Sequence, residues 1–398
     1  MQNKTLEKWE EKTLGEICTI TAGQSPESQF YNAEANGLPF YQGKKEFTNK
    51  YIGAPNVWTT KITKEAQAGD ILMSVRAPVG PINYAIERCC IGRGLASIRK
   101  SEKISNDFLF YYLLSIQDEI GGHDGAVFNS ISRNEIATLK IKLPPLIEQQ
   151  RIVEILDKAF ENIEKAKQNT LKNLNNAKEL FESHLKEYFE VGNQAWQKYK
   201  LSEITTKIGS GATPLGGKKA YIDSGISLIR SMNVYDREFI YEGLAHINEE
   251  QAKQLNVVTI QEKDVLLNIT GASVARCCVV PTDVIPARVN QHVSIIRPKQ
   301  NIVLSSFLCY LLTSNYYKNK LLKDGEEGGA TRQALTKTGL EQFEVYIPNT
   351  ITEQQKIVKQ LDELQERTKK LEQIYSQKLQ DLDELKQSIL QKAFNGEL

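Results

Sequence analysis

Arginine, lysine, asparagine and glutamine side chains recur in loops rich in glycine and proline along this chain of 398 residues. Such side chains carry donors that reach the edges of DNA bases, and the cations among them can neutralise phosphates. In the first half the candidates for DNA contact are Gln42, Lys44, Lys45, Arg76, Arg93, Asn129 and Arg133. In the second half they are Thr213, Lys218, Lys219, Arg230, Asn233, Asn290, Gln291, Arg332 and Gln333.

Each candidate also has an ordinary explanation as a solvated surface residue or a member of a local ion pair. The pairs Lys44-Lys45 and Lys218-Lys219 could be soluble turn tips, and Tyr41, Trp58 and Tyr235 are more typical of a core than of a base-stacking surface. The net charge of the chain is only +1. A DNA-binding protein with this balance must gather its cations on one face or borrow charge from a partner.

Three kinds of catalytic or metal site are disfavoured by spacing. The segment GATPLGGK at 211–218 resembles a phosphate-binding loop, but Ala212 stands where the first glycine is needed and Lys219 where Ser or Thr would bind magnesium. The Pro144-Pro145 pair is followed by leucine, so the chain lacks the Asn/Asp-Pro-Pro-aromatic motif of adenine methyltransferases. The four histidines show no metal-ligand spacing. We expect no catalytic residue, no metal and no cofactor.

The cysteines and the apolar content indicate an ordinary intracellular protein. No two of the six cysteines form a C-x-x-C pair, and we expect buried thiols in two matching strands, since ArgCysCys at 88–90 recurs at 276–278. The opening MQNKTLEKWEEK is charged, and no apolar run reaches the ~18 residues of a membrane helix. The sequence therefore predicts a cytoplasmic location.

The chain contains an internal repeat. GluGlnGln at 148–150 returns at 353–355, within PPLIEQQRIVEILD at 144–157 and PNTITEQQKIVKQLD at 348–362. GlyGlnSerPro at 23–26 likewise returns as GlyAlaThrPro at 211–214. Two copies with similar ends and diverged middles suggest two similar devices directed at different targets.

A long helix is predicted at the end of each copy. Residues 148–190 contain no proline or glycine, Gly192 and Gly396 are suited to end the two helices, and Thr352 to cap the second. Steps alternating between three and four residues give each helix an inward stripe. In the first helix the stripe is Leu156, Phe160, Ile163, Lys167, Thr170, Leu174, Ala177, Phe181, His184 and Tyr188. In the second it is Ile357, Leu361, Leu364, Thr368, Leu371, Tyr375, Lys378, Leu382, Leu385 and Ile389.

These helices determine the predicted architecture. A helix of ~43 residues is about 65 Å long and cannot fold back on its own globular unit, so we expect the two helices to pair in antiparallel fashion. The predicted division is 1–147, 148–190, 191–350 and 351–398, with a globular unit before each helix. The units are expected to be α+β with mainly antiparallel sheets. Strands are predicted at 70–75, 95–98, 293–296 and 343–347, and helices at 108–120 and 305–322.

At this point the residues resemble a known family. The pattern Trp-x-x-x-x-Leu-x-x-Ile opens both copies, at Trp9 and at Trp196. With GDILMSVRAPVG at 69–80, IGRGLASIR at 91–99 and the tail LKQSILQKAFNGEL at 385–398, it resembles the specificity subunit of type I restriction-modification systems. The second copy keeps only QHVSIIR at 291–297 in place of IGRGLASIR.

The resemblance implies a non-catalytic DNA-binding subunit. Each globular unit would be a target recognition domain that reads one half of a split target. The helices would set the gap and dock two methyltransferase (M) subunits and two restriction (R) subunits. The GluGlnGln and LysAlaPheAsnGly segments suit either an M-subunit dock or intramolecular capping and coil packing.

Two other functions remain open from the residues alone. A coiled-coil scaffold whose globular units bind proteins, without DNA recognition, would share the repeat and the heptads. A stand-alone nucleotide-dependent enzyme would use the loop at 211–219. We rank both below DNA recognition.

Overall fold

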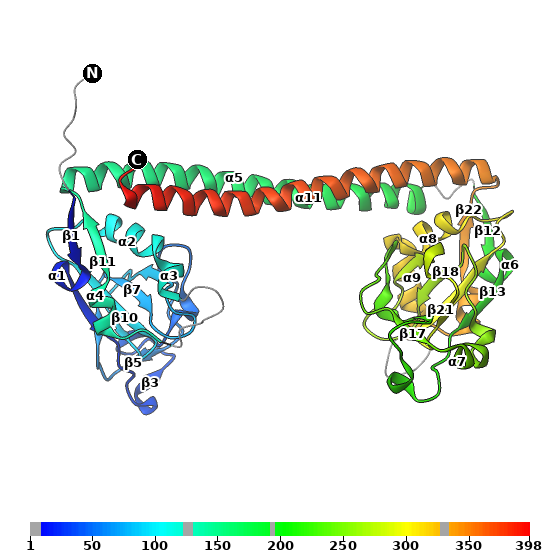
Figure 1. Cartoon of the computed structure of the whole chain (residues 1–398), viewed down its shortest axis with the longest axis horizontal. Coiled ribbons are helices and arrows are strands. Elements are labelled where there is room, and N and C mark those ends of the chain that lie inside the picture. Colours follow the sequence, from blue (N-terminus) through cyan, green and yellow to red (C-terminus); the bar gives the residue numbers. More distant parts are fainter. Residues whose placement is uncertain (1–8, 122–129, 192–195, 327–333) are drawn as a thin grey trace, which may run out of the picture. The chain divides into compact units, whose positions relative to one another are not determined.

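The computed structural model describes residues 9–121, 130–191, 196–326 and 334–398. They form two compact units, Met1–Thr170 with Gln377–Leu398, and Leu171–Ser376. Each unit holds one globular domain, which we call domain 1 (residues 10–143) and domain 2 (residues 197–347), together with parts of two long helices (Figure 1). Among the residues described, no helix is both long and apolar enough to cross a membrane.

Domain 1 is built on three sheets of small strands. The first pairs β1 (Glu10–Thr13) with β11 (Lys140–Leu143). The second is antiparallel, in the order β2 (Cys18–Ala22), β10 (Leu95–Lys100), β7 (Ile71–Ser74) and β8 (Ile82–Tyr84). The third has the order β3 (Tyr31–Asn32), β5 (Trp58–Thr59), β4 (Leu38–Tyr41), β9 (Cys89–Ile91) and β6 (Glu65–Ala66). Its helices are α1 (Leu14–Ile17), α2 (Asn106–Ser115), α3 (Gln117–Gly121) and α4 (Arg133–Thr138).

Domain 2 follows the same plan. Its strands are β12 (Gln197–Lys200), β13 (Thr205–Ser210), β14 (Ile226–Ile229), β15 (Val234–Tyr235), β16 (Glu238–Phe239), β17 (Ala245–Ile247), β18 (Val265–Asn268), β19 (Cys277–Val279), β20 (Ala287–Val289), β21 (Val293–Pro298) and β22 (Glu344–Ile347). The order β13-β21-β18-β19 repeats β2-β10-β7-β8, and β12 with β22 repeats β1 with β11. Its helices are α6 (Leu201–Ile204), α7 (Glu249–Gln254), α8 (Ser305–Thr313), α9 (Asn315–Glu326) and α10 (Lys337–Gln342).

The predicted α+β class is confirmed, with differences of detail. Strands β7, β10, β21 and β22 occupy the predicted positions, and most strand pairs are antiparallel. Two pairs are parallel, β4 with β9 and β14 with β20. Each helix predicted after the central sheet is divided in two, because the chain leaves the helical conformation at Ile116 and becomes extended at Ser314.

The recurring ArgCysCys segment was wrongly matched between the repeats. Cys89 and Cys90 lie in β9, which pairs in parallel with β4, whereas Cys277 and Cys278 lie in β19, which pairs with β18. By sheet order the counterpart of β9 is β20, and that of β19 is β8. The shared letters are therefore a coincidence. The thiols are free, and all are buried except that of Cys18, which is half-buried.

The two long helices are α5 (Leu146–Lys186), continued by a π-helical turn at Glu187–Val191, and α11 (Ile351–Asn395). Gly396 has a φ of 79° and ends α11 as predicted, while Gly192 lies outside the described residues. The cap of α11 is Thr350 rather than Thr352. Its Oγ1 accepts a hydrogen bond from the Glu353 N–H at 3.2 Å, because the helix begins at Ile351, two residues earlier than a cap at Thr352 requires.

The helices contact each other within each unit and run in opposite directions there. In the first unit the Lys386 ammonium lies 5.0 Å from the centre of the Phe160 ring. In the second unit the Tyr188 hydroxyl donates to Gln360 Oε1 at 2.8 Å. The beginning of α5 thus packs on the end of α11, and the end of α5 on the beginning of α11 (Figure 1).

The predicted stripe is confirmed in α5 and partly wrong in α11. Every stripe residue of α5 is buried or half-buried. In α11, Lys378 and Leu385 are exposed, and Leu379 and Lys386 are half-buried instead. The stripe takes a step of four after Tyr375 where a step of three was predicted, since an α-helix of 3.6 residues per turn drifts against a strict heptad.

Candidate nucleic-acid interface

Loops from five parts of domain 1 meet at one end of its sheets. We call residues 23–24, 41–42, 75–76, 91–95 and 130–131 the recognition frame of domain 1. Backbone hydrogen bonds join them: Gly23 N–H to Leu95 O at 2.9 Å, Gln24 N–H to Ile91 O at 2.9 Å, Gly92 N–H to Tyr41 O at 2.8 Å, Val75 N–H to Gly94 O at 2.9 Å and Ile131 N–H to Val75 O at 3.0 Å.

Domain 2 repeats these five bonds in residues 211–212, 229–230, 269–270, 289–293 and 334–335. The corresponding bonds are Gly211 N–H to Val293 O at 3.0 Å, Ala212 N–H to Val289 O at 3.1 Å, Asn290 N–H to Ile229 O at 3.0 Å, Ile269 N–H to His292 O at 2.9 Å and Leu335 N–H to Ile269 O at 2.9 Å. A bridge between Thr270 and Ala334 matches that between Arg76 and Ser130. The two frames can therefore be compared position by position.

The glycine of the repeated Gly-x-Ser/Thr-Pro turn is required by this frame. A Cβ atom on Gly23 would lie 2.2 Å from the Gly92 carbonyl oxygen, and one on Gly211 would lie 1.9 Å from that of Val289. No side chain fits at such a distance, so each turn can approach its neighbouring loop only with glycine. The sequence repeat of this turn thus records a shared backbone arrangement.

The side chains on the two frames differ although the backbone is the same. Gln42 corresponds to Arg230, Arg76 to Thr270, Arg93 to Gln291 and Gly94 to His292. Glutamine and arginine are the side chains that best recognise adenine and guanine edges, respectively. Two copies of one scaffold thus present different hydrogen-bonding groups.

The structure brings several predicted residues of domain 1 together. Gln42, Arg76 and Arg93 lie on the frame and are exposed. Lys44 and Lys45 follow Gln42 in a short 3-10 helix, Lys44–Glu46, and are also exposed.

Two further predicted residues of domain 1 contribute differently. Arg133 Nε donates to the Ile20 carbonyl at 2.9 Å and so ties α4 to β2. Asn129 lies outside the described residues.

In domain 2, Asn290 and Gln291 lie on the frame, and Thr213, Lys218 and Lys219 are exposed in the loop that follows β13. Arg230 is restrained: its Nη2 donates to the Gly243 carbonyl, and its guanidinium carbon lies 5.3 Å from the centre of the Tyr221 ring. Arg332 and Gln333 lie outside the described residues.

The prediction that Asn233 contacts DNA is wrong. Its side chain is fully buried, and its amide nitrogen donates to the carbonyls of Ile240 at 2.9 Å and Glu242 at 3.3 Å. Its Oδ1 accepts from the Arg230 N–H at 3.0 Å. Asn290 is also only 8% exposed, with its Oδ1 accepting from the His292 N–H at 3.1 Å. Both amides shape loops.

The loop at 211–219 does not form a phosphate cradle. The Gly217 N–H donates to the Pro214 carbonyl at 3.0 Å, and the Lys219 N–H to that of Gly216 at 3.2 Å. Amides that are satisfied within the loop are not directed at an anion. Within the described part of the chain there is also no group of three or more histidine, cysteine, aspartate or glutamate side chains able to hold a metal ion.

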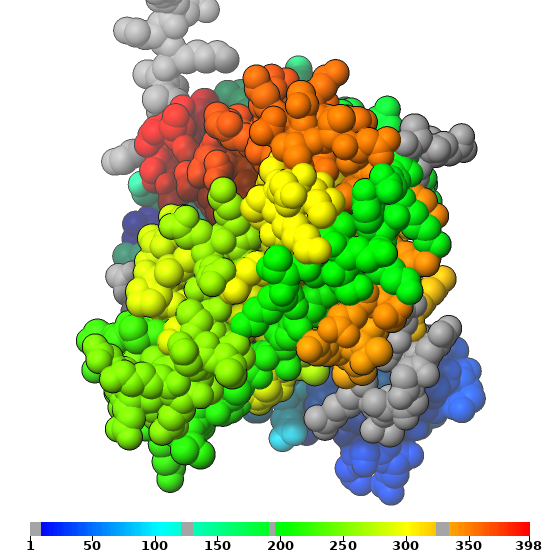
Figure 2. Space-filling view, turned by 90° about the vertical axis from the view of Figure 1, so that its right-hand side faces the viewer, coloured from blue at the N-terminus to red at the C-terminus, as the bar shows by residue number. Residues whose placement is uncertain are grey.

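Sequence reasoning missed a cleft beside the frame of domain 2. Its volume is about 620 Å³, and its lining includes Met232, Tyr235, Thr270, Arg276 and His292. The guanidinium carbon of Arg276 lies 4.2 Å from the centre of the Tyr235 ring, which is 41% exposed. A tyrosine at 235 is more typical of a core, and a two-residue strand has no periodicity that could indicate its exposure. Figure 2 views domain 2 with the first part of α11, in orange, along its top.

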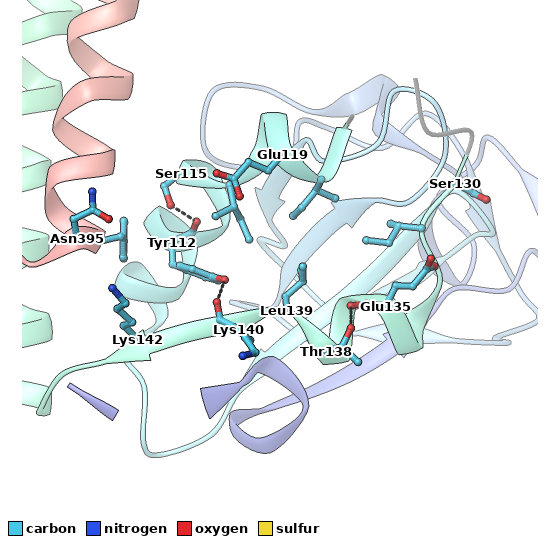
Figure 3. Close-up of a pocket in the computed structure, with 14 residues that line it drawn as sticks. Tyr112, Ser115, Glu119, Ser130, Glu135, Thr138, Leu139, Lys140, Lys142 and Asn395 are labelled. Atoms are coloured by element: carbon cyan, nitrogen blue, oxygen red, sulfur yellow. Dashed lines mark hydrogen bonds between the residues drawn. The ribbon is translucent and has the colours of Figure 1, made fainter. Parts of the chain in front are cut away.

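Domain 1 has a larger cavity, of about 680 Å³, which extends from Asn395 at the end of α11 to Ser130 at the frame (Figure 3). The Tyr112 hydroxyl, which lines it, donates to the Lys140 carbonyl. In domain 2 the fully buried Tyr317 of the longer helix α9 packs against the corresponding strand, and its hydroxyl accepts from the Tyr346 N–H at 3.0 Å.

The GluGlnGln segments attach the helices to the domains. Gln149 is buried, its Oε1 accepts from the Ser105 N–H at 2.8 Å, and its Nε2 donates to the Pro144 carbonyl at 2.9 Å. Gln354 repeats the arrangement with the Leu304 N–H at 2.9 Å and the Ile302 carbonyl at 2.9 Å. The middle glutamine of each segment is thus a clamp within the chain.

The LysAlaPheAsnGly segment is also used within the chain. The Phe394 ring packs 5.1 Å from that of Phe108, and Ala393 is buried. Phe189 is the counterpart in domain 2, with its ring 5.5 Å from that of Phe307. Each domain core is closed by the start of one long helix and the end of the other. For these residues the structure shows the intramolecular alternative.

Comparisons with known proteins agree on one family. The sequence model described as the type I restriction modification DNA specificity domain matches residues 6–173 and 193–380. The putative type I restriction enzyme MjaX specificity subunit of Methanocaldococcus jannaschii is 46% identical over 181 residues, a match that spans 42% of this chain and 42% of that protein. The EcoBI specificity subunit of Escherichia coli is 24% identical, over 98% of this chain and 86% of its own length.

Two solved structures share the fold. A chain from work on complex assembly and conformational transition of the type I R-M system has a TM-score of 0.80 at 21% identity, with all of both chains covered. The HsdS subunit from Thermoanaerobacter tengcongensis has a TM-score of 0.61 at 20% identity, with 98% of each chain covered.

Proposed function

Since the chain belongs to the specificity subunits of type I restriction-modification systems, we propose that it reads a bipartite DNA target, with one half-site for each domain. The observation that carries this proposal is the duplicated recognition frame. One set of backbone hydrogen bonds, present twice, supports two different sets of side chains. That arrangement suits two unrelated base sequences read with the same geometry.

The contacts to DNA would divide by type. Gln42, Arg76, Arg93 and Gln291 would approach base edges from the frames. The exposed lysines beside the frames, Lys44 and Lys45 in domain 1 and Lys218 and Lys219 in domain 2, would bind phosphates. Phosphate contacts fix the position of a protein on the duplex without reading its sequence.

The helices would set the gap between the half-sites. Helix α5 has 41 residues and is about 60 Å long, which corresponds to at most about 18 base pairs. Two modules on one rod bind DNA together only where the spacing fits, and simultaneous binding multiplies affinity.

Catalysis would belong to partner subunits. Two M subunits and two R subunits would dock on the helix pair, and they would transfer the methyl group and cut the DNA in the cytoplasm. This chain would contribute specificity and no catalytic group. Because its net charge is only +1, it would bind DNA weakly alone and tightly beside its partners.

The test is a gel-shift titration of the complex of chain and M subunits with duplexes that carry the two half-sites. Affinity should fall when one base pair is added to the gap, and it should fall steeply with salt. The alternative of a protein-binding scaffold predicts no salt-dependent DNA affinity in that complex. Equal affinity at every gap length would refute the role of the helices as a ruler.

A further inference from the structure

We propose that the equivalent positions 93 and 291 read one base pair in each half-site, Arg93 a guanine and Gln291 an adenine. This inference rests on the proposed function and adds to it the specificity-determining residues. It follows from the matched frames: both side chains stand at the third position of the loops 91–95 and 289–293, whose ends form the same backbone bonds.

In each of the other three pairs compared above, one member is bonded within the chain or has no side chain. Arg230, opposite Gln42, is bound to the Gly243 carbonyl. Thr270, opposite Arg76, is within 2.6 Å of His292 Nδ1, and Gly94, opposite His292, has no side chain. Only the 93/291 pair has an exposed, long, polar side chain in both domains.

Gln291 is oriented by its neighbours. Its Nε2 lies 3.1 Å from His292 Nε2, and His292 Nδ1 lies 2.6 Å from Thr270 Oγ1. An amide nitrogen can only donate, so His292 Nε2 accepts, and the ring proton sits on Nδ1, which donates to Thr270. Gln291 keeps one N–H donor and its Oε1 acceptor for a ligand. Adenine presents the complementary pair in the major groove, the N7 acceptor and the N6 donor.

The backbone of Arg93 is held in place, and the N–H groups of its guanidinium are available to a ligand. Its N–H donates to Ser25 Oγ at 3.2 Å, which joins the loop to the Gly-x-Ser-Pro turn. Among the described residues, none accepts a hydrogen bond from its guanidinium and none forms an ion pair with it. Two parallel N–H groups of a guanidinium match the O6 and N7 acceptors of guanine.

The test is a binding selection from random 40-base-pair duplexes, made with the complex of full-length chain and M subunits. In R93Q one guanine of the domain 1 half-site should become adenine, and in Q291R one adenine of the domain 2 half-site should become guanine. The preference at that position should change about tenfold or more while the other half-site stays the same.

Matched variants separate base reading from charge and folding. K44Q, close to the frame, should lower affinity for all sequences without altering the selected site, and R93K should lose the guanine preference without gaining adenine. H292A should weaken the adenine preference of domain 2 alone. Unchanged half-sites in R93Q and Q291R complexes that still bind DNA would overturn the inference. If the unaltered complex selected no bipartite site, the proposed function itself would fail.

Discussion

At the scale of single residues, one buried carboxylate serves the fold in each domain. Asp70 accepts two hydrogen bonds from the Arg99 guanidinium, each at 2.8 Å, and the Gln67 N–H donates to it at 2.9 Å. In domain 2, Asp264 bonds Arg297 and the Gln261 N–H in the same way. In each domain this carboxylate joins two neighbouring strands, β7 and β10 in domain 1 and β18 and β21 in domain 2. Neither carboxylate is among the proposed base contacts.

Replacing Asp264 by alanine should destabilise domain 2. The carboxylate is fully buried, and removal of one member of a buried pair leaves a charge without its partner, at a cost of about 3–5 kcal/mol. The measurement is urea unfolding of the D264A chain. E262A, a change of an exposed carboxylate two residues away, is the control and should unfold as the unaltered chain does. Equal midpoints for the two variants would contradict this role.

Alkaline pH should weaken the fold through its thiols and phenols. Burial raises the pKa of the Cys89 thiol to about 12, and burial first, then Asp107, raises the pKa of Tyr84. Below the unfolded thiol pKa of about 8.5, both states are protonated and the stability is fully present. As the pH rises toward 12, only the unfolded state ionises, so each such thiol costs up to about 1.4 kcal/mol per pH unit.

Urea midpoints at pH 8, 9.5 and 10.5 would measure this decline. C89A should show a shallower decline than the unaltered chain because one raised group is gone. A slope that is the same in both proteins would show that Cys89 does not contribute.

The sequence was a good guide to which loops carry polar side chains. It was a poorer guide to which of those side chains are exposed and which are bonded within the chain. It placed Gln42, Arg93 and Gln291 on exposed loops, and the structure brings the first two onto one frame. It could not tell Asn233 from these, because an asparagine that bonds backbone carbonyls and one that faces solvent have the same local sequence. The burial of Asn233 depends on residues 240 and 242, which only the folded loop brings near.

At the scale of elements, the attachment of each long helix depends on one glutamine. Q149A should lower the stability of domain 1 by about 1–3 kcal/mol, because the Ser105 N–H would lose its acceptor in a partly buried place. Q354A should do the same to domain 2 through the Leu304 N–H. The measurement is thermal unfolding of the full chain.

The neighbouring glutamines provide matched controls. Gln150 and Gln355 are exposed on the same helix turns, and Q150A and Q355A should leave the melting temperature unchanged. If they lowered it as much as Q149A does, the segment would act through helix propensity and not through the clamp.

The helices were the most predictable elements, since period, length and end residues all point the same way. The stripe of α5 could be derived in full, and that of α11 failed only after Tyr375, where geometry and heptad diverge. The pairing of β4 with β9 and of β14 with β20 could not be derived, because strands of three or four residues carry no usable period.

At the scale of the whole molecule, the proposed function depends on the length of the helix pair, which can be changed. Insertion of seven residues after Lys172 in α5 and seven after Tyr375 in α11 would preserve the inward stripe, because two helical turns return each face to within about 20°. Seven residues add about 10.5 Å, or about three base pairs of DNA. The doubly extended chain should therefore select the same two half-sites with a gap about three base pairs longer.

An insertion in α5 alone puts the two helices out of register and should lower both stability and affinity. The measurement is the gap selected from duplexes in which the half-sites are fixed and their separation varies. Selection of the original gap by the doubly extended chain would mean that the spacing is set by something other than the helices.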